Sequence, residues 1–258
     1  MKIHIYTLIL AAAGVLLLPS CVKDRLYHTP HPDKGVLVVT ADFSDRTDGA
    51  EIPSEYMVSI EETAYAASTA SAFVYPDLLS PEEHGVSAYN LPSGMSVSEG
   101  IVSAYRPEDG SVEPMPGYLF TCFRTVGIAA DDTVRTDLQM VQRTGDLYFE
   151  FEVIEGDVTR VSSVTGTLSG VAGSFDIAAG AIGTDSGNAL FGFTVEGDTV
   201  SSQVRLLGLI GTQMLTLEIS FTDGRSQSVD VDVTGYLDGF GADLTEPLEL
   251  RGNLSLPV

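Results

Sequence analysis

The strongest constraint on the fold is an alternation of apolar and polar side chains that recurs along most of the chain. In GDLYFEFEVIEGD, residues 145–157, the apolar side chains Leu147, Phe149, Phe151 and Val153 are separated by mostly polar ones. Successive side chains of a strand point to opposite faces, so this segment predicts an antiparallel strand with one buried face. A helix would need apolar residues every three or four positions.

Similar segments follow one another, separated by turn residues. Examples are GVLVVTADF, YMVSIE, GYLFTCFRTVGI, SQVRLLGLIG and QMLTLEISFTDGRSQSVDVDV. Strands spaced by roughly 8 to 15 residues predict an all-β fold of the sandwich type. Asp223-Gly224 predicts a hairpin with a two-residue type I′ turn. One turn of helix is expected near Val158 and another between Thr234 and Phe240.

The first twenty residues have the form of a secretory signal peptide. Lys2 precedes an apolar run from Ile3 to Leu18, which at 16 residues is short for a membrane span. The run ends in Leu18-Pro19-Ser20-Cys21, which has the shape of a bacterial lipobox. This pattern predicts cleavage before Cys21 and lipidation of that cysteine.

Lipidation would anchor the chain in a membrane, because each acyl methylene buried in lipid contributes about 0.8 kcal/mol. A diacylglyceryl thioether on Cys21, together with an N-linked acyl chain such as palmitate, gives enough methylenes for a stable anchor. The alternative is an ordinary signal peptide with an incidental cysteine nearby. The small Ser20 directly before Cys21 favours lipidation.

The strand pattern and its interruptions divide the chain into four parts. Residues 1–20 form the predicted signal peptide, and residues 21–35 a lipidated tether without an apolar period. The alternation restarts clearly after Thr144-Gly145-Asp146. We therefore predict an N-terminal β-sandwich domain over 36–144 and a C-terminal one over 145–258.

Charge and cysteine content exclude several functions. The net charge is −23, and removal of residues 1–20, whose only charged side chain is Lys2, makes it −24. Nucleic acids and anionic membrane surfaces would be repelled, so neither is an expected ligand. With Cys21 lipidated, Cys122 has no partner for an intramolecular disulfide, and its apolar surroundings predict a buried structural thiol.

The sequence offers little for catalysis or metal binding. The motifs G-x-S-x-G, H-E-x-x-H and C-x-x-C are absent, and no lysine follows position 34. His84 is expected in a charged turn before a strand. His28, His31 and Asp33 lie in the tether, where they favour a solvated linker over a metal site. We expect neither an enzyme nor a cofactor or metal site.

The C-terminal segment is a candidate for contact with a partner. One face carries apolar side chains and the other carries polar residues such as Glu249 and Arg251; the apolar face comprises Leu248, Leu250, Leu254, Leu256 and Val258. The strand could complete the sheet of its own domain or be lent to another subunit by strand addition. The terminal strand of a sandwich normally has this pattern, which favours the first role.

Several stretches together resemble the FimB-like minor fimbrial anchor lipoproteins of type V pili. They are LPSC, the following VKDRLYHTPHPDKGVLVVTADFSDR, the block TGTLSGVAGSFDIAAG, and LTLEISFTDGRSQSVDVDVTGYLDGF. The resemblance implies two tandem transthyretin-like Greek-key β-sandwich domains and no catalysis. It also implies a surface-exposed lipid anchor in the outer membrane that binds the base of a fimbrium and limits its length. The implied partner is the major fimbrial subunit, bound by β-strand addition.

The resemblance raises a question about Arg46. Related pilins are matured by an arginine-specific protease that removes the first strand and opens a groove for the donor strand of the next subunit. Arg46 lies directly after the first predicted strand, where such a cut would fall. Cutting there would separate the body from Cys21, so an anchor is expected to stay uncut.

Two other functions fit parts of the same pattern. One is a tip or accessory subunit of the pilus. The other is a glycan-binding surface lipoprotein, which would need exposed aromatic side chains. Tryptophan is absent, and most Tyr and Phe residues alternate along strands. The candidates for an exposed platform are Tyr27, Tyr65, Tyr75 and Tyr105.

Overall fold

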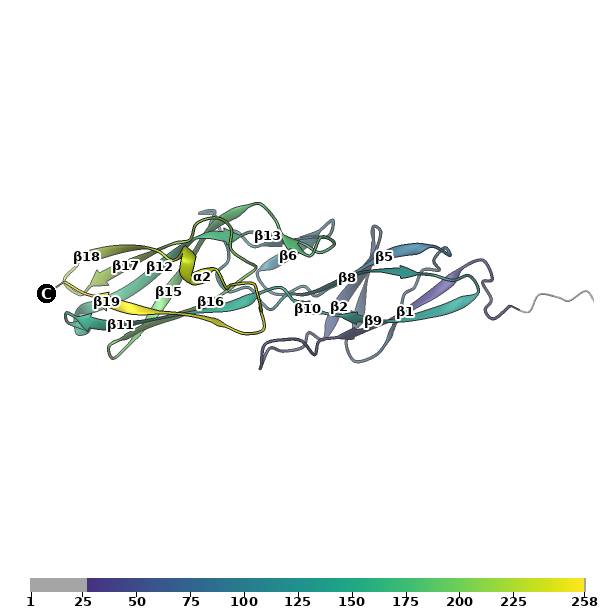
Figure 1. Cartoon of the computed structure of the whole chain (residues 1–258), viewed down its shortest axis with the longest axis horizontal. Coiled ribbons are helices and arrows are strands. Elements are labelled where there is room, and N and C mark those ends of the chain that lie inside the picture. The colour runs from purple at the N-terminus through teal and green to yellow at the C-terminus, as the bar shows by residue number, and fades with distance from the viewer. Residues whose placement is uncertain (1–26, 258) are drawn as a thin grey trace, which may run out of the picture.

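The computed structural model describes residues 27–257, which form two β-sandwiches one after the other along an elongated body (Figure 1). The first sandwich consists of a three-stranded sheet, β4-β1-β9, and a five-stranded sheet, β10-β8-β5-β2-β3. Its strands are β1 (Gly35–Asp42), β2 (Glu55–Ile60), β3 (Thr63–Ser68), β4 (Phe73–Val74), β5 (Glu83–Tyr89), β8 (Phe120–Gly127), β9 (Asp132–Gln139) and β10 (Val141–Gln142).

The first core lies between these two sheets. Alternate residues of β1, among them Leu37 and Val39, are fully buried and face residues such as Val58 and Val86 of the opposite sheet. The alternation in GVLVVTADF thus gives one face to the core and the other to solvent. Cys122 is buried in this core, as predicted, and burial raises the pKa of its thiol.

The second sandwich consists of a seven-stranded sheet, β18-β17-β12-β15-β16-β11-β19, and a four-stranded sheet, β14-β13-β7-β6. Two short helices, η2 (Val158–Arg160) and α2 (Thr234–Leu237), lie where helical turns were predicted. The strands are β6 (Met95–Ser98), β7 (Ile101–Ala104), β11 (Gly145–Glu155), β12 (Val161–Ala172), β13 (Ser174–Asp176), β14 (Ala181–Ile182), β15 (Ser186–Glu196), β16 (Thr199–Leu206), β17 (Met214–Phe221), β18 (Ser226–Asp232) and β19 (Leu248–Ser255).

The hairpin β6–β7 belongs to the second sandwich although it precedes β8 in the chain. Val102 of β7 pairs with Phe175 of β13, and both side chains are buried in the second core. Leu119 also belongs to that core, whereas the next residue, Phe120, belongs to the first. The chain therefore passes between the sandwiches more than once, and the division at residue 144 stays a prediction.

The two sandwiches share one feature of strand order. In the first, the opening strand β1 runs parallel to β9, with Leu37 opposite Val134. In the second, the opening strand β11 runs parallel to β19, with Leu147 opposite Leu248. Both domains thus begin with a strand that is held against a late strand of the same domain.

The prediction of an all-β chain with two sandwiches in tandem is confirmed. The two-residue type I′ turn at Asp223-Gly224 is wrong. Phe221 N donates to Arg225 O, so three residues form the loop, and Gly224 has a φ of 84° whereas Asp223 has none in the positive range. A type I′ turn needs positive φ at both central residues, which favours glycine or asparagine at each.

Candidate functional site

Cys21 and the signal peptide lie outside the described residues, but the end of the tether is held on the first sandwich. The backbone N–H groups of His28 and Thr29 donate to the two carboxylate oxygens of Asp131, at 2.7 and 2.6 Å. Burial opposes ionisation of Asp131, but these bonds and one from the Thr29 hydroxyl outweigh it and lower its pKa. His28 and Thr29 are therefore fixed to the first sandwich.

Arg46 is engaged by its own loop. Its Nε donates to Ala50 O at 3.0 Å and its Nη1 donates to Phe43 O at 2.8 Å. The side chain is half-buried. A protease pocket that takes up an arginine side chain would first have to break both bonds.

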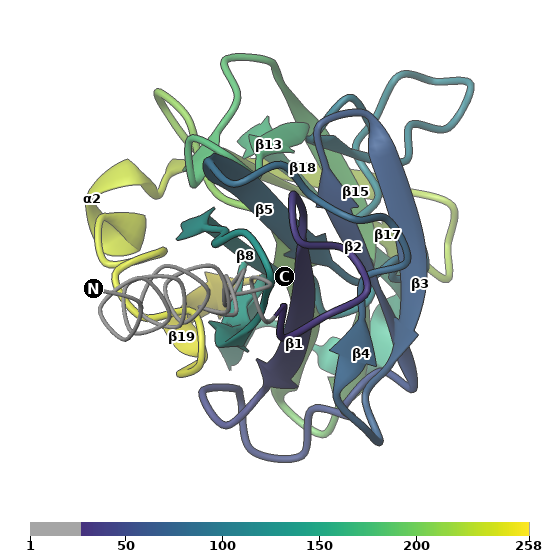
Figure 2. The same cartoon turned by 90° about the vertical axis from the view of Figure 1, so that its right-hand side faces the viewer.

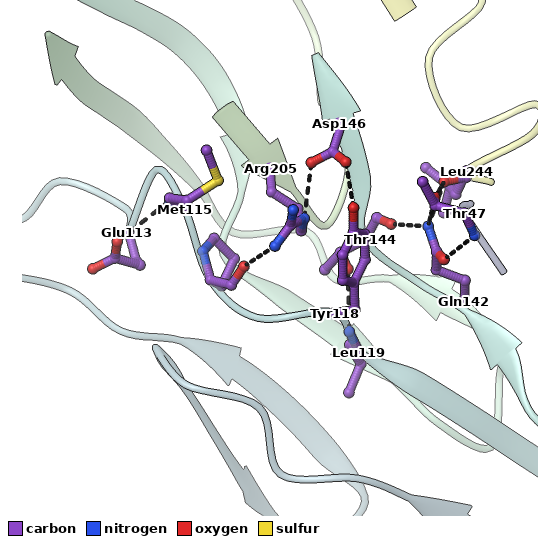
Figure 3. A network of polar contacts seen from close by, with 11 residues as sticks. Thr47, Glu113, Met115, Tyr118, Leu119, Gln142, Thr144, Asp146, Arg205 and Leu244 are labelled. Atoms are coloured by element: carbon purple, nitrogen blue, oxygen red, sulfur yellow. Dashed lines mark hydrogen bonds and ion pairs between the residues drawn. The ribbon is translucent and has the colours of Figure 1, made fainter. Parts of the chain in front are cut away.

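The junction between the sandwiches holds a buried ion pair (Figure 3). Arg205 Nε of β16 donates to Asp146 Oδ1 of β11 at 2.8 Å, with 15% and 4% of the two side chains exposed. The hydroxyl of Tyr118 donates to the other oxygen of Asp146 at 2.6 Å, and the Arg205 guanidinium lies 3.5 Å from the centre of the Tyr118 ring. Arg205 Nη1 also donates to Pro116 O.

A second set of bonds joins the first sandwich to the loop before β19 (Figure 3). Gln142 Nε2 donates to Leu244 O and to Thr144 O, and Gln142 Oε1 accepts a bond from Thr47 N at 2.9 Å. The Thr144 hydroxyl accepts a bond from Leu119 N. Gln142 and Thr144 are buried, so these bonds satisfy polar groups that have little access to water.

The C-terminal strand β19 lies in the sheet of its own domain. The side chains Leu250, Leu254 and Leu256 are buried in the second core, and Leu248 packs against it. Val258 lies outside the described residues. On one side β19 pairs with β11, and within residues 27–257 no strand pairs with its other side.

A groove separates β19 from β18, the other end of the seven-stranded sheet. Its volume is about 190 Å³, and it is closed at one end where Gln227 Nε2 donates to Ser255 O. Val231 is 42% exposed and Tyr236 is 73% exposed beside it. The apolar side chains that line it include Leu215, Leu217, Val229, Val231, Tyr236, Leu250 and Leu254. We call this groove the β18–β19 seam.

The four tyrosines considered for a glycan platform do not share one face. Tyr75 is 3% exposed and packs edge-on against Tyr65, with ring centres 5.2 Å apart. Tyr105 follows β7 in the second sandwich, whereas Tyr65 lies on β3 in the first. Tyr27 is exposed at the start of the described chain.

The structure also bears on the predictions for His84, for metal binding and for membrane spans. His84 lies within β5 rather than in a turn and is buried, with its Nε2 3.0 Å from Ser80 O. Within residues 27–257 no group of three or more His, Cys, Asp or Glu side chains is arranged to hold a metal ion. No helix in this part of the chain has the length and apolar character needed to cross a membrane.

Residues 77–256 match the family of fimbrillin-A associated anchor proteins Mfa1 and Mfa2. The chain belongs to this family. The match begins just after β4 and ends just after β19, so it includes the β18–β19 seam and the Tyr118, Asp146 and Arg205 contacts of the junction. Mfa2-type proteins are structural anchors, which agrees with the resemblance drawn from the sequence.

Solved structures share the fold at low sequence identity. A candidate adhesin from Bacteroides ovatus has a TM-score of 0.69 at 14% identity, covering 87% of this chain and 94% of that one. The fimbrial anchor protein Mfa2 from Porphyromonas gingivalis has a TM-score of 0.58 at 12% identity, covering 86% and 90%. A candidate polysaccharide-binding protein from Bacteroides thetaiotaomicron has a TM-score of 0.61 at 11% identity, covering 86% and 92%. No curated protein matches the sequence.

The bonded groups at the tether and the junction were not predicted. Asp131 directly precedes β9, whereas Gln142 and Asp146 lie near the ends of β10 and β11, and a polar residue at the end of a strand gives no local sign of burial. The burial that distinguishes them depends on the meeting of distant segments. Tyr118 and Arg205, for example, approach Asp146 from 28 and 59 residues away.

Proposed function

We propose that the protein is a lipid-anchored subunit that holds the base of a fimbrium at the outer membrane and ends its growth. The observation that carries this proposal is the placement of the two ends of the body. The tether enters beside β1 at one end, and β18 and β19 reach the opposite end (Figure 1). A membrane contact and a fimbrial contact can therefore be made at the same time.

The membrane contact is assigned to acyl chains on Cys21. Two or more chains give stable attachment, because a single chain binds a membrane only reversibly. Asp131 holds the chain to the body at His28 and Thr29, seven and eight residues after Cys21. The chain without residues 1–20 is strongly acidic, with a net charge of −24, and is therefore repelled by anionic lipid.

The fimbrial contact is assigned to the β18–β19 seam. Each of the two strands has an open edge, and an incoming strand of the fimbrial subunit would gain main-chain hydrogen bonds there. Its alternate side chains would cover Val231 and the neighbouring apolar lining. Donation of β19 itself is the less favourable alternative, because Leu250, Leu254 and Leu256 would have to leave the core.

We assign the end of fimbrial growth to β1, the first strand, which is retained in this chain. β1 lies between β4 and β9, and Arg46 is bonded to Phe43 and Ala50 within the loop that follows β1. With β1 in place, the position between β4 and β9 that its removal would open to the strand of a further subunit stays filled. The chain can then receive one fimbrial subunit at its second sandwich and none at its first.

Site-specific crosslinking tests this assignment. A photoreactive amino acid in place of Tyr236, at the seam, should crosslink to the fimbrial subunit in intact cells. The same group in place of Phe123, which is 43% exposed on the first sandwich, is the matched control and should not. Crosslinking at Phe123 with none at Tyr236 would place the fimbrial contact elsewhere.

A further inference from the structure

The strand β3 has an open edge on the first sandwich, the domain nearest the tether. Within residues 27–257 it pairs with β2 alone and lies at the end of its sheet, on the outer side of the body (Figure 2). The register with β2 continues without a bulge to Thr69, whose N–H donates to Ser54 O. Alternation along the ladder leaves the N–H and C=O groups of Ala64, Ala66 and Ser68 directed away from β2.

The edge of β3 lacks the features by which proteins normally block edge strands. Such features are charged side chains, prolines, bulges and very short length. The sequence of β3 is TAYAAS, and Ala64, Ala66 and Ser68 are exposed. An exposed edge of this kind pairs readily with an extended segment of another chain.

Apart from those at the β18–β19 seam, the other edges of the described residues are charged or short. β9 carries Asp132, Arg135 and Asp137, and Arg124 Nη1 donates to the carbonyl of Asp137. The strands β4, β10 and β14 have two residues each, and β6 has four. β18 and β19 also have open edges, but these edges face each other across the seam and are already assigned to the fimbrial subunit. β3 is thus the long edge in this part of the chain that carries neither charge nor cover.

Charge near β3 restricts what can bind. Residues 55–68, which include β2, the turn and β3, contain no lysine or arginine. Glu61 and Glu62 form the turn at one end of β3, and Glu55 lies opposite Ser68 at the other. Asp77 accepts a bond from the Tyr65 hydroxyl at 2.9 Å. β3 itself therefore carries no charged side chain, whereas the residues at both of its ends are acidic.

A pocket beside the edge gives room for one side chain of an added strand. It has a volume of about 320 Å³ and lies next to Ala66, between the start of β2 and the residues after β5. Leu91, which is 60% exposed, and Met57 contribute apolar surface to it. Because alanine has a short side chain, a larger apolar side chain on the next strand can reach over Ala66 into this pocket.

We propose that β3 accepts an extended segment of another protein, uncharged in its middle and basic at both ends, as a sixth strand of its sheet. This site lies on the opposite sandwich from the β18–β19 seam and is independent of fimbrial attachment there. A second copy of this chain does not fit. Antiparallel pairing of β3 with its own copy would bring Glu61 and Glu62 of one chain toward Glu55 of the other.

Titration with a synthetic peptide tests the proposal. The probe has two lysines at each end and the centre Thr-Val-Thr-Leu-Thr-Val, and the matched control has glutamates in place of the lysines. NMR of the purified protein should show shifts and slower hydrogen exchange at Ala64, Ala66 and Ser68 with the lysine peptide. At low salt, the glutamate peptide should bind at least about tenfold more weakly.

Two variants separate backbone pairing from charge. Ala66→Pro removes an outward N–H that β2 does not use, and should weaken binding of the lysine peptide at least about tenfold, whereas Ala66→Ser should leave it unchanged. Should Ala66→Pro fail to fold, the double change Glu61→Gln and Glu62→Gln replaces it and should reduce the preference for lysine over glutamate ends.

Several results of these experiments would contradict the proposal. Equal binding of the two peptides, no binding of either, or shifts centred away from β3 would overturn the proposal. So would full binding to a folded Ala66→Pro variant or, where that variant does not fold, an unchanged preference in the doubly substituted protein. Dimers that form through β3 would identify a second copy as the occupant and would equally contradict it.

Discussion

Asp146 accepts a 2.6 Å hydrogen bond from the hydroxyl of Tyr118, so a carboxylate of the second sandwich is bonded to a ring that packs on the first core. The other oxygen of Asp146 pairs with Arg205 of its own sandwich. A buried charge is thus satisfied from both domains. In an anchor under tension, this bond would resist separation of the two sandwiches.

The ion pair at the junction should matter for stability. Asp146→Ala leaves the Arg205 guanidinium without its partner at a site where 15% of that side chain is exposed, and we expect a loss of about 3 kcal/mol in the free energy of unfolding. Glu249→Ala removes an exposed partner of Arg251 and should cost less than about 1 kcal/mol. Urea denaturation measures both, and equal losses would contradict a special role for the junction.

Tyr75 should make the first sandwich sensitive to alkali. Burial, and then the nearby Asp77 charge, raise the pKa of Tyr75 from 10.0 to about 12. The native state therefore retains a proton that the unfolded chain loses, so stability is full below pH 10 and falls as the pH rises from 10 to about 12.

Tyr75→Phe provides the control for this effect. It removes the bond from the hydroxyl to Thr63 O, costs about 1 kcal/mol at neutral pH, and should flatten the alkaline fall. Thermal unfolding between pH 8 and pH 12 measures the difference. An alkaline fall of the same size in the variant would assign it to other groups.

The tether contact should be released by acid. Since the folded-state pKa of Asp131 is lowered, the stability of this contact is full above its ordinary value of 3.8 and is lost as the pH falls through the lower folded value. The amide resonances of His28 and Thr29 report the release. Asp131→Ala should free both amides at neutral pH, and resonances that do not change in this variant would contradict the contact.

The terminal strand should stabilise its own chain. Leu254→Ala leaves a cavity in the second core and should reduce the free energy of unfolding of the isolated protein by about 3 kcal/mol. Asn253→Ala, at an exposed neighbouring position, is the matched control and should have little effect. If both variants unfold like the wild type, β19 is not part of the folded monomer and donation to another subunit becomes the better account.

The sequence predicts where individual strands lie more reliably than which strands pair with each other in a sheet. Alternation in the segments that became β1, β11 and β19 identifies which residues face a core, because that depends on local geometry. Parallel pairing of β1 with β9 is not predictable in the same way, since the two strands are far apart in sequence. The passage of β6 and β7 into the second sandwich also depends on long-range packing.

The site was predicted in part. The apolar face of β19 is evident from its leucines, whereas the seam beside it depends on how β18 and β19 meet at the ends of one sheet. The tether looked like a free linker because Pro30 and Pro32 interrupt any pattern. The carboxylate that holds it, Asp131, lies 103 residues from His28, and no local signal connects the two.

The central claim is that Cys21 links the fimbrium to the membrane, and the direct measurement is the share of fimbriae that remain on cells carrying Cys21→Ser. Wild-type cells should keep their fimbriae, with Cys21 acylated by mass spectrometry of the membrane fraction. The variant should release fimbriae into the medium with this protein still at their base. Fimbriae that stay on the variant cells, or an unacylated Cys21 in wild-type membranes, would contradict the account.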